Sequence, residues 1–405
     1  MFERVFKLSE HKTTVKTEVM AGITTFMTMA YILAVNPSVL GSTGMDTTAV
    51  LLATALASCL GTLCMAFMAN LPFALSAGMG LNAFMAYTVV AGYGYSWQVA
   101  LLAVFIEGLI FIVLSLTNIR EAIFNAIPLT LKKGVSVGIG LFIAFIGLQN
   151  SGLCVDSATL VGIISFPENF HTAGICALLT LIGLFFTAVF YTRKMKGAIL
   201  YGILLTWILG MLCQVTGLYV PTPDAGFYSL FPSWGMTDFS RLGLTFGQCF
   251  NVDFSAVGIV NFIVVIFSFL FVDIFDTLGT LIGVATKAKM LDKDGKLPGI
   301  KPALMADSIA TSAGAILGTS TTTTFVESAS GVAVGGRTGL TALVTGILFL
   351  VSTLFAPIFT AIPSFATAPA LIMVGFLMVG TVTEINFDLD NLAESIPAYL
   401  AIIAM

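Results

Sequence analysis

The sequence predicts an all-α polytopic membrane protein, built as a seven-plus-seven inverted-repeat transporter with two broken helices. Hydrophobic residues make up 58% of the chain and charged residues 9%, against about 25% charged in an average soluble domain. Apolar stretches recur along the whole sequence, and about 20 such residues form a helix that spans a bilayer. Two of these stretches, Leu71–Tyr87 and Gly318–Leu340, are interrupted by glycine and polar residues. These observations exclude a soluble protein.

The apolar stretches give the expected spans in chain order. We place them near 18–40, 48–69, 71–91, 97–117, 131–149, 172–192, 197–217, 255–285, 303–318, 319–338, 339–357, 365–381 and 396–405. A long polar connector, Leu218 to Asp253, separates the first seven from the rest and contains Pro221, Pro223, Pro232 and Trp234. The second half is shorter than the first. We therefore expect that the chain lacks part of a thirteenth span and all of a fourteenth.

Basic residues predict the orientation of the chain. With these spans, all of them but Arg241 fall on the side of the N-terminus: Arg4, Lys7, Lys12, Lys16, Arg120, Lys132, Lys133, Arg193, Lys194, Lys196, Lys287, Lys289, Lys293, Lys296, Lys301 and Arg337. Lys and Arg concentrate in cytoplasmic loops. We expect a multi-pass protein of the cell (inner or plasma) membrane with a cytoplasmic N-terminus.

The two interrupted stretches occupy corresponding places. One is the third span from the start, and the other is the third span after the connector. Non-helical backbone at membrane depth persists only inside protein or along a wet cavity. Paired interrupted spans in two halves indicate an inverted-repeat transporter with its site near the bilayer midplane. Their half-helix N-termini would attract acceptor atoms of a substrate.

Ionisable residues within spans are functional candidates by default. Here they are Glu107, Asp273, Asp276, Asp307 and Glu327. Asp273 and Asp276 are three residues apart, so they share a helical face. Two carboxylates in a dry site do not both ionise cheaply, so one is expected to carry a proton. Asp276 and Asp273 are the predicted proton-coupling residues of a symporter.

A planar heterocycle is the substrate that fits the other polar residues. Asn82 supplies a donor and an acceptor, and Glu327 supplies an acceptor for substrate N–H groups. Aromatic side chains pack against flat rings. The predicted substrate-binding residues are Asn82, Asp273, Glu327, Phe84, Phe275, Thr324 and Ser328, with Phe271 and Phe325 as further ring-packing candidates.

Each candidate has a structural alternative. Asp273 and Asp276 can pair with a threonine or a backbone group, Asn82 can cap its half-helix, and Asp307 can tether span nine. Glu107 is more typical of a helix–helix hydrogen bond, and most phenylalanines pack in lipid or protein. Arg337 is expected to snorkel to the cytoplasmic surface, and His171 lies in an exterior loop. The six cysteines have no metal-ligand or disulfide spacing, so we expect no metal, no cofactor and no catalytic residue.

Four segments resemble those of one known family. They are AGITTFMTMAYILAVNP (Ala21–Pro37), SAGMGLNAF (Ser76–Phe84), FVDIFDTLGTLIGVA (Phe271–Ala285) and GTSTTTTFVESASGVAVGGRTGL (Gly318–Leu340). In these the sequence resembles the AzgA-like purine permeases of the nucleobase–cation symporter family. Members of that family continue beyond Met405 through two further helices.

The resemblance implies a fold of fourteen spans, divided into a core domain and a gate domain. The core would comprise residues 1–117 and 254–357, and the gate 118–253 and 358–405. It further implies substrate contacts from Asn82, Asp273 and Glu327, a transport role for Asp276, and proton-driven uptake of hypoxanthine and guanine, or of adenine in close relatives. A homodimer is left open, and no nucleic-acid partner is expected.

We therefore predict a purine nucleobase:proton symporter that works by alternating access, and not an enzyme. A uracil or xanthine carrier shares the expected fold and remains an alternative. An anion transporter of the same fold is a second one, although acidic groups at the site would repel its substrate. An intramembrane aspartyl protease needs aspartates on facing helices, whereas Asp273 and Asp276 lie on one. A passive channel would show a charge ring or a filter motif.

Overall fold

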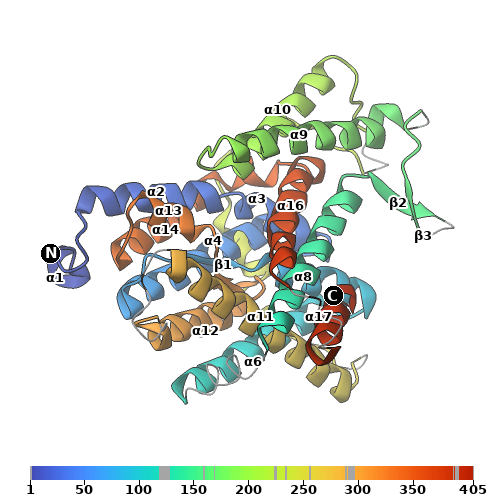
Figure 1. The fold of residues 1–405 in the computed structure, drawn as a ribbon. Coiled ribbons are helices and arrows are strands. Elements are labelled where there is room, and N and C mark those ends of the chain that lie inside the picture. The colour runs from blue at the N-terminus through green and yellow to red at the C-terminus, as the bar shows by residue number, and fades with distance from the viewer. Residues whose placement is uncertain are drawn as a thin grey trace.

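The structure is a computed structural model (Figure 1). It describes residues 2–117, 128–157, 160–167, 169–222, 226–232, 235–254, 257–287, 290, 297–385, 387 and 392–404. Several residues used in the sequence analysis lie outside these ranges: Arg120, Pro223, Trp234, Lys289, Lys293, Lys296 and Met405.

The first part of the chain is helical apart from one interruption. Its elements are α1 (Phe2–Phe6), α2 (Val15–Met29), α3 (Ile32–Gly41), α4 (Thr47–Cys64), the π-helical η1 (Met65–Ala69), β1 (Leu75–Ala77), α5 (Met79–Ala83), the π-helical η2 (Phe84–Gly92) and α6 (Trp97–Leu116). Side-chain oxygens of Thr14, Asp46 and Ser96 cap α2, α4 and α6 by accepting from the backbone of the first turn, which satisfies donors that a helix start leaves unpaired.

The middle of the chain holds three long helices and the connector. The elements are α8 (Leu129–Asn150), β2 (Cys154–Ser157), β3 (Leu160–Ile163), η3 (Phe170–Gly174), α9 (Ile175–Thr192), α10 (Ala198–Val215), η5 (Phe239–Leu244) and η6 (Gln248–Phe250). The connector contacts the start of α4 and the end of the later helix over Ile300–Leu317, because Arg241 pairs with Asp46 at 2.8 Å and the Gly247 N–H donates to the Ile316 carbonyl at 2.7 Å.

The last part of the chain repeats the pattern of a helix, an interruption and further helices. It contains α11 (Ile259–Lys287), α12 (Ile300–Leu317), β4 (Thr322–Thr324), α13 (Ser328–Val334), α14 (Gly339–Ser352), η7 (Thr353–Phe355), α15 (Ala356–Thr360), α16 (Ser364–Val379), η8 (Gly380–Glu384) and α17 (Leu392–Ala404).

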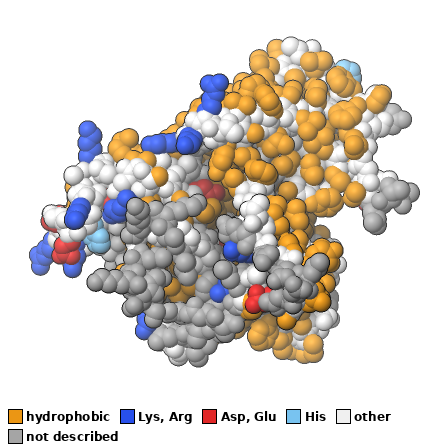
Figure 2. Space-filling view, viewed as in Figure 1, with side chains coloured by type: hydrophobic (Ala, Val, Ile, Leu, Met, Phe, Trp, Pro, Cys, Tyr) orange, Lys and Arg blue, Asp and Glu red, His pale blue; other side chains and the backbone are white. Residues whose placement is uncertain are grey.

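The structure confirms a multi-pass membrane protein. Within the described residues, nine helices are long and apolar enough to cross a bilayer, and they match nine of the predicted spans. The other four predictions correspond to α12, to α17 and to the two interrupted stretches. Figure 2 shows hydrophobic side chains over α9 and α10, where Leu178, Leu181, Phe185, Ile208 and Leu212 are exposed. An exposed apolar surface of this kind marks a membrane-facing surface.

The expectation of an all-helical chain is wrong at four short strands. β1 and β4 form one antiparallel pair, and β2 and β3 form another. β1 and β4 lie in the two interrupted stretches, where an extended chain in a water-poor interior needs partners for its backbone groups. Each strand supplies the partner of the other, which is why both interruptions are extended and paired.

The helices pack in two groups. α14 packs against α2 and α4, and α12 packs against α4 and α6; α8 packs against α16 and α17, and α9 against α10 and α16. In Figure 1 the first group occupies the side near the N-terminus, and α9 and α10 lie side by side at the opposite edge. Figure 2 shows acidic side chains, in red, recessed between these two groups of helices.

Candidate functional site

The site is built on a two-stranded ribbon made of β1 and β4. Ser76 lies opposite Thr323 in the antiparallel register. The ribbon is extended at both ends, where the Gly78 N–H donates to the Thr321 carbonyl at 2.9 Å and the Phe325 N–H donates to the Ala74 carbonyl at 3.0 Å. The two interrupted stretches therefore meet at one place, and α5 and α13 begin just beyond it.

Buried polar side chains fasten the ribbon to α4 and α12. The Ser58 and Ser76 hydroxyls are 2.7 Å apart, and the Thr62 hydroxyl accepts from the Leu75 N–H at 3.0 Å. On the other strand, the Thr311 hydroxyl donates to the Thr322 carbonyl at 3.0 Å. Every one of these side chains is fully buried. Satisfied buried polar contacts hold a single arrangement, so the ribbon is a rigid base for the site.

Asp276 lies against the ribbon on the side of α11. The Thr323 hydroxyl donates to Asp276 Oδ2 at 3.2 Å. A Cβ at Gly78 would lie 3.2 Å from the same carboxylate oxygen and 3.2 Å from the Thr323 hydroxyl. Glycine at this position therefore leaves room for the carboxylate beside the start of α5.

Glu327 stands at the start of α13, and its partner is Tyr31. The Tyr31 hydroxyl donates to Glu327 Oε1 at 2.7 Å. Below it, the Thr28 and Ser330 hydroxyls are 2.8 Å apart and join α2 to α13. Sequence reasoning did not include Tyr31, although it lies in the Ala21–Pro37 segment; a tyrosine in an apolar span is the only signal.

Asp276 and Glu327 belong to one cluster. Asp276 interacts electrostatically with Glu327 and with Asp307, and Tyr31 interacts with both Glu327 and Asp276. Asp276 and Glu327 are both partly exposed. Two neighbouring carboxylates can accept hydrogen bonds from donor groups of a ligand and can share a proton.

Asp273 has different partners from Asp276. The Thr277 hydroxyl lies 2.8 Å from Asp273 Oδ1 and 3.0 Å from Asp307 Oδ1, and all three side chains are fully buried. A hydroxyl has one proton to donate. The Thr277 hydroxyl therefore donates to only one of the two carboxyl groups at a time. These residues form a second acidic group, next to Asp276 but inside the protein.

Asn82 is fully buried in α5. The Ser320 hydroxyl donates to Asn82 Oδ1, and the amide nitrogen lies 4.0 Å from the Met79 sulfur. Its neighbour along the ribbon is Glu107, whose Oε2 accepts from the Thr321 hydroxyl at 2.8 Å. Asn82 and Glu107, both from the first half of the chain, thus both contact the Thr319–Thr324 stretch.

The two remaining polar candidates contact the ribbon itself. The Ser328 hydroxyl accepts from the Ala74 N–H at 3.0 Å, which ties the start of α13 to β1. Thr324 is buried, and because successive strand residues point to opposite faces, it lies on the face away from the Thr323–Asp276 contact. Thr323 is the threonine that the structure brings to Asp276.

Phenylalanines line α11 in two edge-to-face pairs. Phe84 packs against Phe269 with ring centroids 5.0 Å apart, and Phe271 packs against Phe275 at 4.6 Å. Phe325 is 6% exposed at the end of β4. Phe275 therefore lies on α11, the helix that carries Asp276, and Phe84, which belongs to η2, packs against that helix.

Glu18 is a buried carboxylate that sequence reasoning missed. It accepts from the Arg337 N–H at 2.9 Å, from the Thr341 N–H at 3.2 Å and from the Thr341 hydroxyl at 2.6 Å. It thereby caps the start of α14. Arg337, expected at the cytoplasmic surface, donates through Nη1 to the Val332 and Gly336 carbonyls at 2.7 Å. His171 contacts the Leu218 carbonyl at 3.2 Å.

The comparisons with known proteins agree with this architecture. The sequence profile described as Permease family matches residues 16–405. Guanine/hypoxanthine permease PbuG of Bacillus subtilis is 46% identical over 99% of this chain and 88% of its own, and Adenine permease AdeP of Escherichia coli is 42% identical over 100% and 86%. Among solved structures, the transmembrane domain of the cyanobacterial bicarbonate transporter BicA gives a TM-score of 0.67 at 15% identity, covering 96% of this chain and 94% of that one. That likeness shows a shared fold.

Proposed function

Because the chain belongs to the Permease family, we propose that it is a purine nucleobase:proton symporter of the cell membrane. The relatives named as guanine/hypoxanthine and adenine permeases support a purine substrate. We assign hypoxanthine and guanine as the first substrates to test, with adenine as the alternative within the same class.

One observation carries the proposal. Two carboxylates, Glu327 and Asp276, lie beside the ribbon and belong to one electrostatic cluster. Purine rings present N–H groups, and an ionised carboxylate is purely an acceptor with two oxygens. Glu327, held at the start of α13 by Tyr31, is the proposed acceptor for those N–H groups, and Phe84 and Phe275 supply apolar surface for the ring.

The same cluster argues against the anion alternative. A sulfate or bicarbonate ion would meet Asp276 and Glu327, whose hydrogen-bond and charge partners in the described part of the chain include no basic side chain. Like charges at close range repel, the more strongly in a water-poor site. The fold shared with a bicarbonate transporter does not alter this, because one fold carries different sites.

Proton coupling is proposed for the α11 carboxylates. Asp276 contacts the ribbon, and Asp273 shares Thr277 with Asp307. A proton on one of these carboxyl groups would reduce their negative charge while the neutral nucleobase is bound to Glu327. The transport cycle is proposed as alternating access, in which the helices around the ribbon move against α8–α10 and α16, with the N-terminus in the cytoplasm.

Uptake into proteoliposomes tests the proposal. An inward proton gradient should drive accumulation of labelled hypoxanthine, and unlabelled guanine should compete, whereas uracil and sulfate should not. A sodium gradient at equal pH on both sides is the control and should drive none. Accumulation that follows sodium, or competition by sulfate, would contradict the proposal.

A further inference from the structure

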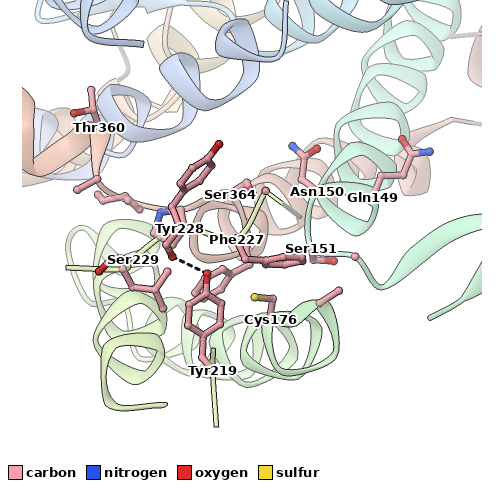
Figure 3. Close-up of a pocket in the computed structure, with 18 residues that line it drawn as sticks. Gln149, Asn150, Ser151, Cys176, Tyr219, Phe227, Tyr228, Ser229, Thr360 and Ser364 are labelled. Carbon is pink, nitrogen blue, oxygen red and sulfur yellow. Dashed lines mark hydrogen bonds between the residues drawn. The ribbon is translucent and has the colours of Figure 1, made fainter. Parts of the chain in front are cut away.

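A cavity of about 540 Å³ lies apart from the ribbon (Figure 3). It is an open cavity that lies between the end of α8, the start of α9, the connector and the turn between α15 and α16. None of its lining residues belongs to the Glu327–Asp276 cluster. The connector lies on the face opposite the basic loops by the charge pattern of the sequence, so the cavity is on the proposed exterior side.

The connector wall of the cavity is held in place by hydrogen bonds. The Tyr219 hydroxyl donates to the Tyr228 carbonyl at 2.7 Å, a contact drawn in Figure 3. Beyond it, the Leu230 N–H donates to the Gln214 side chain at 2.8 Å, and the Trp207 indole donates to the Leu230 carbonyl at 2.8 Å. Burial raises the pKa of Tyr219 to about 12, so this phenol stays neutral.

The opposite wall is connected to the helix of Asn82. Asn150, at the end of α8, lines the cavity, and its amide lies 3.3 Å from the Tyr87 hydroxyl. Tyr87 belongs to η2, which continues directly from α5. An amide has two donors and an acceptor with two lone pairs, so the contact with Tyr87 uses only part of the capacity of Asn150.

The chemistry of the lining defines the class of ligand. None of the described residues that line the cavity carries a charge, so nothing there compensates the desolvation of an ion. Aromatic rings come from Tyr219, Phe227, Tyr228 and Phe365, and hydrogen-bonding groups come from Asn150. Ligand pockets typically have volumes of about 300–1,000 Å³ with a few placed polar groups. The lining fits a neutral, flat molecule with donors and acceptors on its edge.

We propose that this cavity is an outer binding site for a neutral planar heterocycle, occupied by the nucleobase before or after the site at Glu327. The inference rests on the proposed function for the identity of its ligand. The proposed exterior site lies at the end of α8, where Asn150 contacts Tyr87 of η2. η2 continues from α5, the short helix that follows the ribbon strand β1. The Tyr87–Asn150 contact links occupancy of the cavity to the helix that carries Asn82.

Tyr228 provides the variant that tests this site. Its side chain is 66% exposed, and the wall is held by its backbone carbonyl, so Tyr228→Ala removes the ring and leaves the Tyr219 contact. Phe231→Ala is the matched control, because Phe231 is an exposed aromatic of the same connector that does not line the cavity. Both are made in the full chain carrying Glu327→Gln.

Equilibrium dialysis of labelled hypoxanthine against the purified protein measures both sites. We expect two binding components in the unmodified chain and only the weaker one in Glu327→Gln. Adding Tyr228→Ala should weaken that component about tenfold, since stacking on one aromatic ring is worth this much for a base, and adding Phe231→Ala should leave it unchanged.

A Tyr228→Trp variant gives a second, independent measurement. Because the indole replaces the phenol ring at the cavity, its fluorescence should change with hypoxanthine in the Glu327→Gln chain. Binding that is lost completely in Glu327→Gln, or equal affinities for the two alanine variants, would overturn the outer site while leaving the proposed function intact. Absence of any hypoxanthine binding to the unmodified chain would overturn both.

Discussion

The ribbon region, formed by β1 and β4 with α4, α11 and α12, and the α9–α10 pair bury polar side chains in opposite ways. In the ribbon region the partners come from different elements, as in the contacts of Ser58 with Ser76 and of Thr323 with Asp276. Where α9 meets α10, the threonines donate within their own helices, although Thr180 of α9 also donates to the Phe365 carbonyl of α16 at 2.9 Å. Thr187 donates to the Gly183 carbonyl and Thr206 to the Gly202 carbonyl, both at 2.7 Å.

The α9–α10 contact is built from reciprocal glycine–threonine pairs. A Cβ at Gly183 would overlap the Thr206 hydroxyl, and a Cβ at Gly202 would overlap the Thr187 hydroxyl. Small residues let helix backbones approach closely in a membrane, where burial of apolar surface gives no drive for association. The contact between α9 and α10 is therefore held by close packing.

The difference teaches what each region can do. Hydrogen bonds between separate elements fix the geometry of the ribbon region. Asp276 and Glu327 take part in such bonds and are still partly exposed. In the proposed function, the ribbon region binds the substrate, and the α9–α10 side belongs to the body against which it moves.

The largest effect expected from breaking a bridging contact is at Glu18. Glu18→Ala leaves buried donors at the start of α14 without an acceptor and should lower the free energy of unfolding by about 3 kcal/mol. Glu10→Ala is the matched control, because Glu10 is exposed and pairs only with Lys7 at 3.5 Å; it should change stability by less than about 1 kcal/mol. Thermal unfolding in detergent measures both, and equal midpoints would contradict the comparison.

A smaller loss is expected from separating α9 and α10. Gly202→Val places a branched side chain against Thr187 and should cost roughly 2 kcal/mol through overpacking. Gly283→Ala, in α11, is the control because a Cβ there meets no atom within 4 Å. If the two substitutions changed the unfolding midpoint equally, close approach would not be what holds the α9–α10 pair.

The sequence predicts the long spans and the two interruptions but not how the interruptions pair. Apolar length identifies a span from local residues alone. A three-residue strand has no detectable period, so the interruptions were predicted only as breaks in helices, without the strands β1 and β4 or their pairing. Likewise, no pattern of neighbouring residues predicts that Tyr31 contacts Glu327, 296 residues later, or that Glu18 contacts Thr341. Those partners follow from the folded packing of α2 against α13 and α14.

The spacing of Asp273 and Asp276 shows the same limit within one helix. Residues three apart are neighbours on a helix surface, yet they point about 60° apart at 3.6 residues per turn. That divergence is enough to give Asp276 the ribbon as its partner and Asp273 the Thr277 hydroxyl. Spacing identified the acidic face, and packing decided what each carboxylate contacts.

The two faces of the ribbon give the smallest and most specific prediction. Thr323→Val removes the donor to Asp276 and should lower hypoxanthine uptake about tenfold, since a hydrogen bond to a charged group is worth about this much. Thr324→Val is the matched control on the opposite face, where the hydroxyl has no partner among the described residues, and uptake should be unchanged. Uptake that falls equally in both variants would contradict the assignment of faces.

The central claim is that the carboxylate of Glu327 accepts the N–H groups of a purine. The most direct measurement is binding of labelled hypoxanthine to the purified Glu327→Gln protein at the high-affinity site. A neutral amide keeps the size of the side chain and presents donors to the substrate donors, so affinity there should fall roughly 100-fold while the protein remains folded. High-affinity binding that is unchanged in Glu327→Gln would contradict the account.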